Sequence, residues 1–120
     1  MSDVAEAVRD FEGYTPRVVA DLQNVDFEIE YMREDVEALY SDVELDEAYQ
    51  LIMGNLVTSD DFKSLIGEQE CRVQTLFFDE ILVFIFPSER YQAVFASFDY
   101  EEDFPVNQLV QAVTGITSEE

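Results

Sequence analysis

The chain has 120 residues, and its 28 acidic side chains stand against six Lys and Arg and no His, so its formal charge is −22. A surface of this sign repels nucleic acids and anionic membranes, since both are bound through clusters of basic side chains. A hydrophobic content of 48%, with ten Phe, is too high for a disordered acidic tail. The sequence therefore predicts a folded acidic domain.

Residues 1–24 are predicted to form two N-terminal helices. Val4 and Val8 lie about one helical turn apart, and Pro16 suits the first position of a second helix. Residues 26–32 then alternate apolar and mostly acidic side chains, which is typical of a half-exposed strand.

Residues 33–67 are predicted to be helical in several segments. Ser41 and Glu44 have the spacing of a capping box, which predicts a helix start. Gly54 is predicted to end that helix, and a short further helix should end at Gly67.

Residues 71–98 differ in character and are predicted to form a three-stranded antiparallel meander, because short polar connections separate three apolar runs. The middle run, residues 81–86, has no polar position, so both of its faces should be covered. Residues 105–114 should form a closing helix and residues 115–120 a frayed tail. The prediction is a single α+β domain with a roughly four-stranded, largely antiparallel sheet and helices packed on it.

The chain lacks the residue types that most catalytic and metal sites require. With no His and one Cys, it cannot build a His-based triad or a Cys/His zinc site. Residues 42–46 resemble the start of an EF-hand loop, but Glu47 stands where that loop requires Gly. We therefore expect no enzyme activity, no cofactor and no metal site. A catalytic pair among the 28 carboxylates remains open, because its geometry would be tertiary.

The acids are distributed along the chain, with 11, 10 and 7 in successive blocks of forty residues. At about 1 M salt the Debye length is about 3 Å, so the self-repulsion of such a surface is screened. This pattern predicts a haloadapted protein with potassium and water held non-specifically at its surface. The lone Cys71 and the lack of a secretory leader or spanning segment favour a cytoplasmic location.

One segment departs from the acidic pattern. Residues 71–98 carry a net charge of 2 − 3 = −1, and they hold six of the ten Phe. A buried sheet core would explain this composition. However, adjacent strand residues point to opposite faces, so an uncovered aromatic face would mark a partner site. The candidate interface or pocket residues are Phe77, Phe78, Phe84, Phe86, Phe95, Phe98, Tyr31 and Arg33.

Several segments resemble a group of small, very acidic haloarchaeal proteins that share a domain of unknown function. The resemblance rests on residues 25–36, 39–41, 70–73 and 93–99, and it extends over roughly residues 18–113. It implies no particular activity and no catalytic residue. Residues 54–57 depart from it, because more charge is expected there.

Three hypotheses for function follow. The first is a non-enzymatic regulatory or adaptor domain that acts through protein–protein contacts, with a homodimer as one form. The second is a small-ligand sensor with a pocket between sheet and helices, lined by Tyr31, Tyr40, Phe84 and Phe95. The third is an acidic mimic of nucleic acid, which would need carboxylates in regular rows rather than the scatter observed.

Overall fold

The computed structural model describes residues 3–11, 13–23, 26–88 and 92–118. Within these residues, the elements in chain order are α1 (Asp3–Arg9), β1 (Val18–Leu22), β2 (Phe27–Met32), α2 (Glu34–Glu37), α3 (Asp42–Leu65), β3 (Gln74–Phe77), β4 (Ile81–Pro87), β5 (Ala93–Asp99) and α4 (Val106–Ser118). All neighbouring strands pair antiparallel, in the order β2-β1-β5-β4-β3. The α+β class is confirmed, but the sheet has five strands rather than four.

The additional strand is β1, which occupies a segment predicted to be helical. Val18, Val19 and Leu22 fit one face of a helix, but they also fit a strand that is buried on both sides. β1 lies between β2 and β5 and pairs with both. Long-range pairing on two sides favours the extended form of these residues over their local helical spacing.

α3 is one continuous helix, where two helices were expected. It begins with the predicted capping box: Glu44 N donates to Ser41 Oγ (3.2 Å), and Ser41 N donates to Glu44 Oε1 (3.1 Å). Gly54 does not end the helix, because buried contacts of Leu56 with the sheet offset the cost of about 1 kcal/mol for an internal glycine. The chain leaves the helix at Gly67, whose φ of +79° favours glycine.

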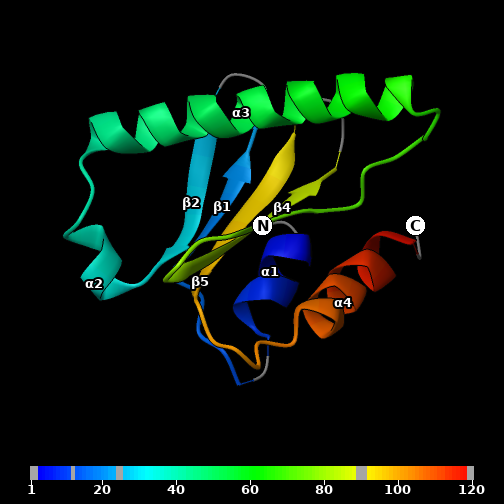
Figure 1. Ribbon diagram of the computed structural model, residues 1–120. Helices are drawn as coiled ribbons and strands as arrows, with labels where there is room; N and C mark the ends of the chain where they lie inside the picture. The colour runs from blue at the N-terminus through cyan, green and yellow to red at the C-terminus, as the bar shows by residue number, and fades with distance from the viewer. Residues whose placement is uncertain (1–2, 12, 24–25, 89–91, 119–120) are drawn as a thin grey trace.

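Helices cover both faces of the sheet (Figure 1), so the fold has three layers. α3 crosses one face, where Tyr49 and Leu56 pack with Val83 and Ile85 of β4. α1 and α4 lie side by side on the other face. The core on that side comprises Ala5, Val8, Val19, Leu82, Phe84, Phe86, Val94, Ala96, Phe98, Phe104, Leu109 and Val113. The apolar run of β4 is therefore covered on both faces.

Several boundaries differ from those predicted. α4 continues to Ser118 instead of ending near residue 115, and Leu109 and Val113 pack it against the core. β3 begins only at Gln74, although the strand was expected from Cys71. Ser2, Glu12 and Tyr91, which belonged to predicted elements, lie outside the described residues. None of the helices in the described ranges is long and apolar enough to span a membrane.

Candidate protein interface

Three of the eight candidate interface residues belong to the core. Phe84, Phe86 and Phe98 are 0, 2 and 1% exposed. The ring of Phe98 lies 5.9 Å from that of Phe84 and 4.9 Å from that of Phe104, just before α4. Their assignment to an exposed interface is wrong, because α1 and α4 cover this face of the sheet.

The proposed ligand pocket is not assembled. Tyr31 and Phe84 pack in the layer that faces α1 and α4, whereas Phe95 packs in the layer that faces α3. Tyr40 is exposed in the connection between α2 and α3. The sheet separates Phe84 from Phe95, so the four residues cannot line one pocket.

Phe77 and Phe78 are exposed, at 62 and 55%. Phe77 is the last residue of β3, and β3 pairs only with β4 among the described residues. The outer side of β3 is therefore a free sheet edge. Gln74–Phe77 contains no charged residue.

The opposite sheet edge is different. β2 carries Glu28 and Glu30, and charged side chains on an edge strand discourage pairing with another chain. The edge at β3 has no such protection in its own sequence. It is the edge at which another strand could pair.

The outward side of α3 is also uncharged along the middle of the helix. Residues 48–59 contain no charged side chain, although Asp, Glu, Lys and Arg make up 28% of the chain. Leu51 is 67% exposed on this side, and Thr58, Phe62 and Leu65 follow it at intervals of seven, eleven and fourteen residues along the same side of the helix. The sequence shows that residues 48–59 lack charge, but only the structure shows which of them are exposed.

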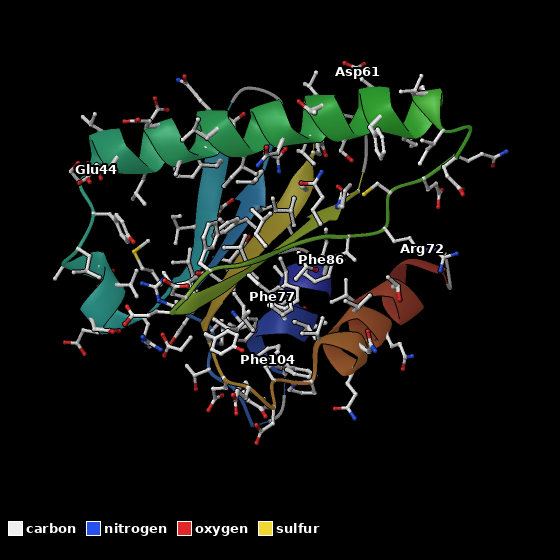
Figure 2. All side chains as sticks on the ribbon, viewed as in Figure 1. Glu44, Asp61, Arg72, Phe77, Phe86 and Phe104 are labelled. Carbon is white, nitrogen blue, oxygen red and sulfur yellow. The ribbon has the colours of Figure 1, made fainter. Side chains whose placement is uncertain are left out.

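A hydrogen bond joins these two uncharged regions. Gln74 Nε2 at the start of β3 donates to the backbone carbonyl of Asn55 on α3, at 3.3 Å. We call the exposed side chains of residues 48–59 of α3 and of Gln74–Phe77 of β3 the uncharged surface. Acids flank it on the helix: Figure 2 shows Glu44 and Asp61 toward opposite ends of α3.

Arg33, the last candidate, lies in an ion cluster at one end of the sheet. Its guanidinium donates to Asp35 at 2.6 and 3.0 Å and to Asp99 at 2.8 and 3.3 Å. The nearly buried Arg17 lies 3.5 Å from the same Asp99 carboxylate. Hydrogen bonds from Arg33 hold the pKa of Asp35 below its usual value. A partner that bound Arg33 would have to displace these carboxylates.

The strand order and the two helical layers define an α+β domain with a five-stranded antiparallel sheet between helices. Residues 2–118 match the model of a domain of unknown function, DUF7522, and the chain belongs to that family. The resemblance to proteins with a domain of unknown function is confirmed to that extent. No curated protein shows significant sequence similarity to this chain.

Two solved structures share the fold. MglB of Myxococcus xanthus superposes with a TM-score of 0.58 at 14% identity, covering 100% of this chain and 98% of the MglB chain. The gliding protein MglB of Thermus thermophilus superposes with a TM-score of 0.56 at 13% identity, covering 100% and 95%. At 13 to 14% identity, this similarity shows a shared fold and nothing more specific.

Proposed function

We propose that this chain is a non-enzymatic regulatory or adaptor domain that acts through protein–protein contacts, and that a second copy of the chain occupies its uncharged surface. The observation that carries the proposal is the exposed apolar surface on β3 and α3 of a chain with a formal charge of −22. Exposed apolar patches of this kind mark interaction sites.

Electrostatics favours this surface for self-association. Two chains of the same strong negative charge repel one another wherever their carboxylates meet. Residues 48–59 and Gln74–Phe77 bring no carboxylate to the contact, so repulsion is weakest there. The apolar side chains of Leu51, Leu76 and Phe77 would supply the favourable burial.

The geometry of β3 suits a symmetric pair. A free edge strand can pair antiparallel with its own copy around a two-fold axis, and such a contact uses the same patch on both molecules. Each sheet would then continue into the other. The hydrogen bond from Gln74 of β3 to Asn55 of α3 keeps the helix close to this edge. In the dimer, the uncharged residues of both α3 helices would therefore lie beside the paired β3 strands.

Two further points belong to the proposal. The fold similarity to MglB, described as a gliding protein in Thermus thermophilus, favours a regulatory or adaptor role over an enzymatic one. We also propose that the carboxylate surface is an adaptation to a salt-rich cytoplasm, where potassium ions and water screen it without a specific site.

The test is sedimentation in molar potassium chloride over a wide range of protein concentration. Leu51→Glu places a charge on the uncharged surface, and Val43→Glu is the matched control at a 76% exposed position of the same helix. We expect Leu51→Glu to raise the dimer dissociation constant at least about tenfold, because lost apolar burial of about 1.4 kcal/mol already corresponds to that factor.

Val43→Glu should leave the dissociation constant unchanged. A wild-type chain that stays monomeric at every concentration would overturn the proposed self-association. Equal effects of the two substitutions would also overturn it, since they would report a general increase in charge rather than a contact at Leu51.

A further inference from the structure

A second group of exposed side chains lies where the β3–β4 turn meets the segment after β5. The backbone connects them: Tyr100 N donates to Glu80 O, and Phe78 N donates to Ile81 O, both at 2.9 Å. We call the exposed residues of this group the aromatic-acidic end. They are Phe78, Asp79, Glu80, Tyr100, Glu101, Glu102 and Asp103.

The carboxylates of the aromatic-acidic end have no cationic partner among the described residues. Within the described part of the chain, none of the five forms an ion pair. Arg33 and Arg17, which lie near Asp99 at the end of β5, are engaged with Asp35 and Asp99. The acids at this end are therefore available to a cation from outside.

Two exposed aromatic side chains lie among these unpaired acids. Phe78 is 55% exposed and Tyr100 is 41% exposed, and neither ring is in contact with another described aromatic ring. Aromatic faces attract Arg and Lys through cation–π interaction, and neighbouring carboxylates pair with the same side chains. The apolar stem of a basic side chain can also cover an exposed ring.

We propose that the aromatic-acidic end binds a segment of another protein that carries Arg or Lys. Its basic side chains would stack on Phe78 or Tyr100 and pair with the adjacent acids. A second copy of this chain is poorly suited to this role, because it has only six Lys and Arg and two of them, Arg17 and Arg33, are held in the ion cluster. The proposal does not depend on self-association through the uncharged surface.

The experiment measures the binding of a fluorescent arginine-rich peptide by anisotropy, in the lowest salt at which circular dichroism shows the protein folded. The double variant Phe78→Ser with Tyr100→Ser removes both rings and leaves the charge unchanged. Leu39→Ser with Tyr40→Ser is the matched control, because it removes an exposed Leu and Tyr beside the acids of α2.

We expect loss of the two rings at the aromatic-acidic end to weaken peptide binding about five- to tenfold, in line with exposed cation–π contacts. The control variant should bind like the wild type. The proposal is overturned if the wild type does not bind the peptide, or if both variants bind equally, since binding would then depend on net charge alone.

A second comparison tests the carboxylates. Glu101→Gln with Glu102→Gln should weaken binding more than Glu34→Gln with Glu37→Gln, although both pairs remove the same charge. Equal losses would contradict a local site. Leu51→Glu should leave the affinity for the peptide unchanged, because Leu51 lies outside the aromatic-acidic end. Peptide binding therefore tests this proposal separately from self-association.

Discussion

Arg33, which follows β2, binds Asp99 at the end of β5 through hydrogen bonds of 2.8 and 3.3 Å, and β1 lies between those two strands in the sheet. The ion pair therefore spans the end of β1. Arg17, which precedes β1, approaches the same carboxylate and donates its backbone N–H to Ser97 O at 2.7 Å. Two of the six basic residues of the chain thus hold three strand ends together.

The first prediction concerns this ion cluster. Arg33→Ala should lower the free energy of unfolding, because it removes bidentate hydrogen bonds to two carboxylates. Solvent screens this partly exposed ion pair, so we expect a loss of only about 1 kcal/mol. Urea denaturation in molar potassium chloride measures the change. Arg9→Ala is the control, since Arg9 makes a single exposed contact of 3.7 Å with Asp10. The ion cluster has no stabilising role if both variants unfold alike.

The second prediction concerns pH. The pKa of Asp35 is lowered in the folded state, chiefly by the hydrogen bonds of Arg33. A lowered folded pKa stabilises the protein above the unfolded value of about 3.9, and this contribution is lost as pH falls through the folded pKa. The difference in melting temperature between wild type and Asp35→Asn should therefore be full at neutral pH and vanish in acid. Asp61→Asn removes the same charge from α3 and is the charge-matched control (Figure 2). An equal pH dependence of the two differences would contradict a specific effect of Arg33 on Asp35.

The third prediction compares two serines of α3 and its cap. Ser41→Ala removes the capping box and should cost about 1 kcal/mol of stability. Ser59 lies inside α3, where Ala is the better helix former. Ser59→Ala should therefore be neutral or stabilise by up to about 0.5 kcal/mol. Thermal denaturation distinguishes the two, and a loss at Ser59 equal to that at Ser41 would contradict a continuous helix.

The composition of a segment does not by itself separate exposed aromatic residues from buried ones. The low charge of residues 71–98 correctly drew attention to Phe77 and Phe78 as exposed residues, but the same criterion also selected Phe84, Phe86 and Phe98. An apolar residue in a strand has the same sequence pattern whether a helix covers it or not. Only the packing of α1 and α4 separates the covered rings from the exposed ones.

The sequence by itself determined the features that depend on neighbours along the chain. It determined the capping box of Ser41 and Glu44, the double burial of residues 81–86 and the lack of any His-based chemistry. These follow from local hydrogen bonding, from side-chain alternation and from which functional groups are present.

The tertiary structure decided what depends on contacts between distant residues. Val18, Val19 and Leu22 satisfy both a helical and an extended pattern, and pairing with β2 and β5 selects the strand. Gly54 can end a helix or lie within one, and burial of Leu56 against the sheet keeps α3 continuous. The −22 charge is a property of the sequence, but the position of the surface without charge is set by the edge of the sheet and the outward side of α3.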